Sequence, residues 1–198
     1  MKKLFCFIIT STLYFSVTCA SATGDKVYTN EEVSVKNSIA YDNALNIPIN
    51  GLIKQYSESG MLKKKTPYKD GKKDGAEERY HGSGALASET HFKDGKQNGF
   101  TKIYNKSGIL LWEIPFKDGE KNGVARKHNQ AGALVGEIPF KDGKINGVEK
   151  QYYESGKLKE ETPYKDNEIN GVKKWYSESG ELEKEILYKD DKAFTAKE

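Results

Sequence analysis

The chain has 198 residues, of which 31% are charged, and its 32 basic and 29 acidic side chains give a formal net charge of +3. These charges are interspersed, which is typical of a solvated surface and not of the basic stripe that marks a nucleic-acid-binding protein. The same near-balance argues against strong electrostatic attachment to an anionic membrane. We therefore expect neither a nucleic acid nor a lipid surface as the partner.

Residues 1–22 have the pattern of a secretory signal peptide. Lys2 and Lys3 precede an apolar run from Leu4 to Val17, and Ala20-Ser21-Ala22 supplies small residues for cleavage. The apolar run is shorter than the ~20 residues that a membrane span needs. We expect an exported protein with no stable membrane insertion after cleavage.

Both cysteines, Cys6 and Cys19, lie in this predicted signal. The mature chain would then have no thiol and no disulfide, so its stability must come from packing and backbone ladders. Acylation at Cys19 is a weaker alternative, because Ser16 and Thr18 are poor choices at that place in a lipoprotein signal. The sequence leaves open whether the protein stays in the periplasm, is released outside the cell or associates with the outer membrane.

Residues 23–50 precede the regular part of the chain. The pieces Val33-Ser34-Val35, Tyr41-Asp42-Asn43 and Ile49-Asn50-Gly51 resemble fragments of a repeat with a longer loop between them. Terminal units of a repeat array must shield an otherwise open end. We therefore expect residues 23–50 to form a degenerate N-terminal cap.

From residue 51 onward the chain repeats. Six glycines stand at an interval of 24 residues: Gly51, Gly75, Gly99, Gly123, Gly147 and Gly171. A fixed period of roughly 20 to 50 residues marks a repeat array. A representative unit, GVEKQYYESGKLKEETPYKDNEIN, runs from Gly147 to Asn170. The pattern predicts six units over residues 51–192 and a C-terminal tail over residues 193–198.

Each unit contains two turn signals, Ser-Gly and Lys-Asp-Gly, separated by runs of about eight residues. Such runs are too short for good helices, so each unit predicts two antiparallel strands. We expect a three-residue loop with glycine last at each turn. This loop places Tyr56 opposite Leu62 and Leu52 opposite Thr66.

The expected register predicts one apolar and one polar face. The apolar face would gather pairs such as Tyr80 with Leu86 and Phe100 with Ile114, together with the recurring Tyr or Phe before Lys-Asp. The candidate partner-binding residues on this face are Tyr80, Phe92, Tyr104, Phe116, Phe140, Tyr152, Tyr164 and Tyr176. The polar face would hold Glu89, Glu113, Glu137, Glu161 and Glu185.

The unit Gly-x-x-x-x-Tyr-x-x-Ser-Gly-x-Leu-x-x-Glu-x-x-Tyr/Phe-Lys-Asp-Gly-Lys-x-Asn-Gly resembles the MORN-repeat variant of the bacterial YwqK-type proteins, many of which are labelled antitoxins. The resemblance covers about Gly51 to Lys192. It implies an all-β fold, namely an elongated single-layer antiparallel sheet (a β-hairpin solenoid) of six 24-residue repeats. It also implies an antitoxin-like role, although a secretion signal suits an antitoxin only if its toxin acts outside the cytoplasm.

Catalytic and metal sites are not expected. His81, His91 and His128 occupy three different positions of the repeat and so do not predict a cluster. The glutamates in register would lie two strands apart, roughly 9 to 10 Å, which is too far for neighbours to share one ion. The turn from Asp70 to Gly75 has Lys72 where a calcium loop needs an acidic ligand. We predict no enzyme, no cofactor and no metal.

Binding is the function that these patterns favour. A single-layer sheet with one apolar face must be covered by curling, by a second array or by a partner. We expect an exported protein–protein interaction module or scaffold, with self-association left open. The alternative is a cell-envelope module for a small ligand, a glycan or choline. Aromatic cages favour Trp, and Trp112 and Trp175 stand at different repeat positions, which makes this alternative weaker.

Overall fold

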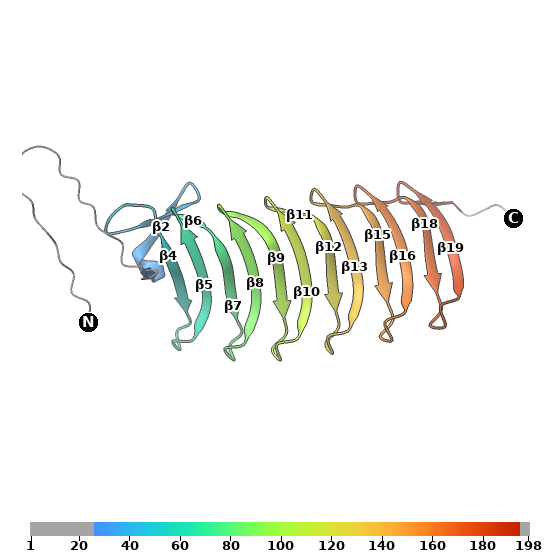
Figure 1. The fold of residues 1–198 in the computed structure, drawn as a ribbon, viewed down its shortest axis with the longest axis horizontal. Coiled ribbons are helices and arrows are strands. Elements are labelled where there is room, and N and C mark those ends of the chain that lie inside the picture. The colour runs from blue at the N-terminus through green and yellow to red at the C-terminus, as the bar shows by residue number, and fades with distance from the viewer. Residues whose placement is uncertain (1–25, 195–198) are drawn as a thin grey trace, which may run out of the picture.

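The structure is a computed structural model that describes residues 26–194. It is a long single-layer sheet of chained hairpins, drawn out from one end of the chain to the other (Figure 1). The predicted signal peptide lies outside the described residues. Within residues 26–194 the single helix is the 3-10 turn η1 (Asn30–Glu32), so no described helix could span a membrane.

Each unit contributes two long strands. The first strands are β4 (Gly51–Tyr56), β7 (Gly75–Tyr80), β9 (Lys96–Tyr104), β12 (Gly123–His128), β15 (Gly147–Tyr152) and β18 (Gly171–Tyr176). The second strands are β5 (Leu62–Lys69), β8 (Leu86–Lys93), β10 (Leu110–Lys117), β13 (Leu134–Lys141), β16 (Leu158–Lys165) and β19 (Leu182–Lys189). Neighbouring strands are antiparallel and follow chain order, as the repeats predict.

Short strands follow the second turn of a unit. They are β6 (Lys72–Lys73), β11 (Glu120–Lys121), β14 (Lys144–Ile145), β17 (Glu168–Ile169) and β20 (Lys192–Phe194). The last of these pairs with β19, so Ala193 and Phe194 belong to the sheet and not to the predicted tail. The sheet does not close on itself: β1 (Lys26–Tyr28) pairs in parallel with β4 at one end, and β20 lies at the other.

The first turn of a unit has the predicted three-residue loop. The Ser57 amide donates to the Met61 carbonyl at 2.8 Å, which leaves Glu58, Ser59 and Gly60 as the loop. Gly60 has a φ of 80°, in the left-handed region that glycine adopts without steric cost. Tyr56 pairs with Leu62, as expected.

The second turn differs from the prediction. Lys69 pairs with Lys72, so the loop has two residues and not three. Asp70 and Gly71 have φ values of 49° and 74°, and positive φ at both central residues is the mark of a type I′ turn. Asn167 and Asp191 take the glycine place in the last two units, with φ values of 78° and 63°.

A β-bulge follows each first turn. Tyr56 pairs with Leu62, but Gln55 pairs with Lys64, so Lys63 is an extra residue in β5. One extra residue shifts the register and reverses which face later side chains occupy. Leu52 consequently faces Pro67, where Thr66 was expected. The same correction applies in later units, where Phe100, Val124 and Val172 face Pro115, Pro139 and Leu187.

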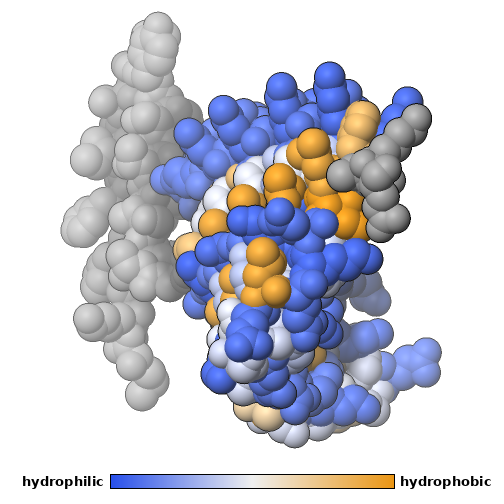
Figure 2. All heavy atoms as spheres, turned by 90° about the vertical axis from the view of Figure 1, so that its right-hand side faces the viewer, coloured by the Kyte–Doolittle hydropathy of each residue, from blue (hydrophilic) through white to orange (hydrophobic). Residues whose placement is uncertain are grey.

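The sheet is curved, with a C-shaped outline when viewed from its C-terminal end (Figure 2). The buried side chains of the repeats share one face: Ile53, Thr66, Glu77, Ala125 and Thr162 are at most 6% exposed. Side chains crowd on the inside of a curve, and among the described residues no second layer covers either face beyond the first unit. We call this the concave face and its opposite the convex face.

The periodic glycines have a structural reason. Gly123 has a φ of 111°, and a Cβ added there would lie 3.1 Å from Pro115 Cγ. Gly75, Gly147 and Gly171 have the same arrangement with Pro67, Pro139 and Pro163. Both the backbone conformation and the proline ring therefore exclude other residues.

The N-terminal segment packs on the concave side of the first unit. Its residues Tyr28, Ala40 and Ile49 are at most 5% exposed and form a core with Ile53, against which Tyr68 packs. The hairpin of β2 (Val33–Lys36) and β3 (Ile39–Asp42) is a separate two-stranded sheet. The sequence indicated a half-repeat that continues the long sheet. This hairpin does not continue it.

Candidate binding surfaces

The predicted apolar face is split between the two sides of the sheet. Tyr80, Tyr104, Tyr152 and Tyr176 lie on the convex face. Phe92, Phe116, Phe140 and Tyr164 lie on the concave face. The expectation of one shared face is wrong, because the bulge between the Tyr and the later ring reverses the side-chain alternation.

The predicted glutamates lie on the convex face, beside the tyrosines. Successive paired residues form a charge ladder across the sheet: Lys54, Lys65, Glu78, Glu89, Lys102, Glu113, Arg126, Glu137, Lys150, Glu161, Lys174 and Glu185. Arg126 lies 3.7 Å from Glu113 and 3.3 Å from Glu137. Six cations and six carboxylates make the ladder neutral, and it separates two apolar rows.

The first of these apolar rows contains the tyrosines and the leucines opposite them. The Tyr152 hydroxyl donates to Glu137 at 2.8 Å, and the Tyr80 hydroxyl donates to Glu78. Burial, reinforced by these carboxylate bonds, raises the pKa of Tyr152 and of Tyr80 to about 12. Both hydroxyls thus bind carboxylates of the sheet itself, so these two tyrosines contribute to the stability of the fold.

The second apolar row, which we call the Val/Pro stripe, runs near the second turns of the last four units. It comprises Phe100, Pro115, Val124, Pro139, Val148, Pro163, Val172 and Leu187. Phe100 is 42% exposed, Val148 is 43% and Leu187 is 50%. The eight residues lie on eight neighbouring strands, and seven intervals of about 4.8 Å give a stripe roughly 34 Å long. Four of the five prolines fall 24 or 48 residues apart, a signal in the sequence that the prediction did not use.

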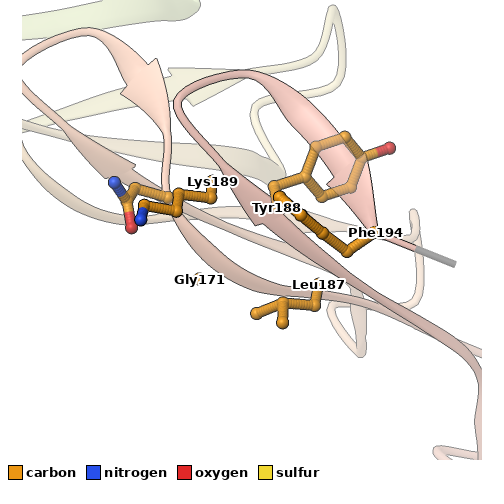
Figure 3. A pocket seen from close by; sticks show the side chains of 6 residues that line it. Gly171, Leu187, Tyr188, Lys189 and Phe194 are labelled. Atoms are coloured by element: carbon orange, nitrogen blue, oxygen red, sulfur yellow. The ribbon is translucent and has the colours of Figure 1, made fainter. Parts of the chain in front are cut away.

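The stripe ends in a hollow at the C-terminal end of the sheet. Leu187, Tyr188 and Phe194 surround this hollow of about 250 Å³ (Figure 3). Leu187 and Phe194 are a cross-strand pair on the last hairpin, and Phe194 is 52% exposed. The apolar stripe thus extends to the last described strand.

Like the charge ladder of the convex face, one row of paired residues crosses the whole sheet on the concave face. We call it the Trp row. It comprises Gln55, Lys64, Arg79, Ser88, Ile103, Trp112, Lys127, Gly136, Gln151, Glu160, Trp175 and Lys184. Trp112 and Trp175 thus share one row, although they occupy different repeat positions. Pairing of the two strands of a hairpin brings those positions together.

The two indoles do not form a joint cage. They lie five strands apart, about 24 Å, and each ring already has a lysine over it. Lys127 Nζ is 5.6 Å from the Trp112 ring centroid, and Lys173 Nζ is 5.0 Å from that of Trp175. The protein's own ammonium groups therefore occupy the places where a choline would bind.

A buried carboxylate with three cations lies at the N-terminal end of the concave face. Glu77 accepts hydrogen bonds from Lys73 at 2.6 Å and from Arg79 at 2.9 Å, and Lys64 Nζ is 4.0 Å away. Burial alone would raise the pKa of Glu77, but the bonds from these cations outweigh it and hold the pKa below its ordinary value. Burial first, and then repulsion from Lys73 and Arg79, lowers the pKa of Lys64.

The histidines contact separate parts of the sheet. His81 bonds the Tyr104 carbonyl and His91 bonds the Phe100 carbonyl. His128 stands where the other units have the convex-face tyrosine opposite a leucine. Its Nδ1 is buried without a hydrogen-bond partner. No group of three or more His, Cys, Asp or Glu in residues 26–194 is arranged to hold a metal ion.

Comparison with known proteins supports the repeat assignment. Four segments match the family model described as MORN repeat variant: residues 49–70, 73–94, 145–166 and 169–190. They correspond to the first two and the last two units of the array. A comparison with curated proteins found no match.

Proposed function

We propose that the protein is a non-catalytic binding module, exported from the cytoplasm, that docks another protein on its convex face. The observation that carries this proposal is the Val/Pro stripe, a continuous apolar row of half-exposed side chains with no covering layer. Exposed contiguous apolar surface of this kind marks interaction sites. MORN repeats are consistent with a binding role.

The stripe suits a protein partner better than a small ligand. Its side chains are Val, Pro, Phe and Leu, which offer apolar area without hydrogen-bonding groups. A row roughly 34 Å long, bordered on one side by a neutral charge ladder and on the other by lysines of the second-turn edge, resembles the apolar centre and polar rim of a protein interface. A glycan stacks on aromatic rings, and Phe100 is the one aromatic ring among the eight side chains of the stripe.

A charge placed in the stripe tests the docking face. Val148→Lys should abolish capture of an envelope protein by the immobilised mature chain, because an ammonium would be buried in an apolar contact. Val35→Lys is a matched control, since Val35 is 65% exposed on the separate β2–β3 hairpin, outside the long sheet. Circular dichroism should show that both variants are folded. A partner held equally well by Val148→Lys would contradict the proposal.

The antitoxin-like role is a finer proposal that rests on the resemblance of the repeat unit. The captured partner, exported alone, should arrest growth, and co-export of the wild-type chain should relieve the arrest. Val148→Lys should not relieve it. A partner that is harmless when produced alone would refute this role and leave the binding function standing.

A further inference from the structure

We propose that the concave face is a second binding site, independent of the Val/Pro stripe, and that it takes an extended acidic polypeptide segment of a partner along the Trp row. The proposal begins with the distribution of charge. The convex charge ladder is neutral, and the lysines of that face gather at its second-turn edge, where Lys69 pairs with Lys72, Lys93 with Lys96 and Lys141 with Lys144. The concave face carries an excess of cations along its length.

The concave face has three transverse rows: the Trp row, the row through Thr66 and Thr162, and the row through Phe92 and Phe116. Seven of their side chains are cationic and three are carboxylates: Lys64, Lys73, Arg79, Lys121, Lys127, Lys173 and Lys184 against Glu77, Glu149 and Glu160. Glu160 bonds Lys173 at 2.9 Å. Lys121, Lys127 and Lys184 lie over aromatic rings and have no carboxylate beside them among the described residues, so an anionic segment would be attracted to them.

The excess is concentrated at the N-terminal end, where one carboxylate faces three cations. Lys64, Lys73 and Arg79 surround Glu77, and the Arg79 side chain is 60% exposed. Next to Lys73 lies a hollow of about 520 Å³ between hairpin β2–β3 and the second turns. Lys72, Lys73 and Lys96 line this hollow with a single carboxylate, that of Asp94. The hollow lies at the second-turn edge of the sheet and the Trp row runs beside the first turns, so these lysines add positive charge to this end of the face without contacting the row.

The spacing of the exposed cations favours an extended polypeptide. Along the Trp row, Arg79 and Lys127 lie four strands apart, about 19 Å, and Lys127 and Lys184 lie five strands apart, about 24 Å. An extended peptide spans such intervals with about six or seven residues. Between Arg79 and Lys127 the row presents the uncharged Ser88, Ile103 and Trp112, which suit the uncharged side chains that separate the acidic residues of the segment.

Other anionic partners fit less well. Nucleic acid presents closely spaced phosphates, which a continuous basic stripe neutralises, and the cations here stand several strands apart. A lipid bilayer is flat, and the surface in question lines the inside of the curve (Figure 2). Both remain outcomes that the experiment distinguishes.

The two tryptophans of the chain both lie in the Trp row and report on it directly. The probe is a fluorescein-labelled peptide of about 16 alternating Glu and Ser residues, long enough to span the row. Binding to the mature chain should change the indole emission and raise the anisotropy. A peptide with Gln in place of Glu should do neither.

Paired charge removals locate the site. Arg79→Gln with Lys127→Gln should weaken peptide binding about tenfold, because two charge contacts are lost. Lys102→Gln with Lys150→Gln removes the same charge from the convex ladder and should leave binding unchanged. Equal weakening by both pairs would show non-specific attraction and overturn the proposal.

Further probes separate the other anions. Binding of single-stranded oligonucleotide or of phosphatidylserine vesicles, without binding of the Glu peptide, would overturn the proposal in favour of that ligand. Absence of any Glu-peptide binding at low salt would also overturn it. None of these outcomes bears on Val148→Lys and the convex face, so the two proposals fail separately.

Discussion

At the scale of single residues, four of the six periodic glycines contact a proline ring, namely Gly75, Gly123, Gly147 and Gly171. Gly123 combines a φ of 111° with a Cβ position 3.1 Å from Pro115. The proline is itself suited to the site, because the ladder is interrupted there: Pro115 accepts a bond from the Asn122 amide through its carbonyl and has no amide of its own to satisfy. The glycine and the proline therefore depend on each other: the proline ring occupies the space that a Cβ at the glycine would need.

Gly123→Ala tests this contact between glycine and proline. We expect a destabilisation of about 1 to 3 kcal/mol, because alanine must adopt a strained φ against the ring. Gly82→Ala is the control, since no heavy atom lies within 4 Å of its added Cβ and its φ is not in the left-handed region. Thermal unfolding followed by circular dichroism measures both. Equal midpoints for the two variants would show that neither strain nor contact fixes the glycine.

At the scale of elements, the two turns of a unit obey different rules. The first is a three-residue loop that ends in glycine, and the second is a two-residue turn with both residues at positive φ. Asn167 occupies the glycine place of the second turn at a φ of 78°, so this place accepts asparagine. The requirement is conformational, because no atom lies within 4 Å of a Cβ added at Gly119.

Substitutions at Gly119 separate conformational from steric effects. Gly119→Asn should cost little, whereas Gly119→Val should cost about 1 to 2 kcal/mol, since a β-branched residue is disfavoured at positive φ. Chemical denaturation of the two variants provides the comparison. An asparagine variant as unstable as the valine variant would mean that the turn tolerates glycine alone.

The repeat, the hairpins and the first turn could be predicted from sequence because their signals are local: spaced glycines, turn residues and short alternating runs. The bulge could not, because its extra residue has no fixed identity and is Lys63 in one unit and Leu111 in another. Because the prediction left out this extra residue, it placed Phe92 and Phe116 on the wrong face. The Trp row also escaped prediction, because the pairing of Trp112 with Lys127 joins different repeat positions.

At the scale of the whole molecule, curvature gives the two faces different characters. The concave face crowds its central side chains and has cations along its length. The convex face spreads its apolar rows apart around a neutral ladder and gathers its lysines at the second-turn edge. Each unit contacts its neighbours along the chain, so such an array gains stability roughly unit by unit. Its two ends are unlike: the first unit is covered by residues 26–50, and the last exposes Leu187 and Phe194.

This asymmetry predicts opposite responses to truncation. A chain that stops at Asn170 loses β18 to β20 and should keep its strand signal per residue with a modestly lower unfolding midpoint, because the preceding units keep their own contacts. A chain that lacks residues 23–50 should be much less stable or aggregate. It loses the core around Ile49, which is fully buried, and leaves Ile53 and the edge of β4 exposed.

Circular dichroism and light scattering on the two truncated chains measure these responses at equal concentration. The comparison is matched, because the deletions are of similar length. If removal of β18 to β20 unfolded the rest of the array, stability would be cooperative over the whole sheet and the unit-by-unit account would fail. If removal of residues 23–50 were harmless, the buried contacts of Tyr28, Ala40 and Ile49 would contribute little, and the open edge of β4 would need no cover.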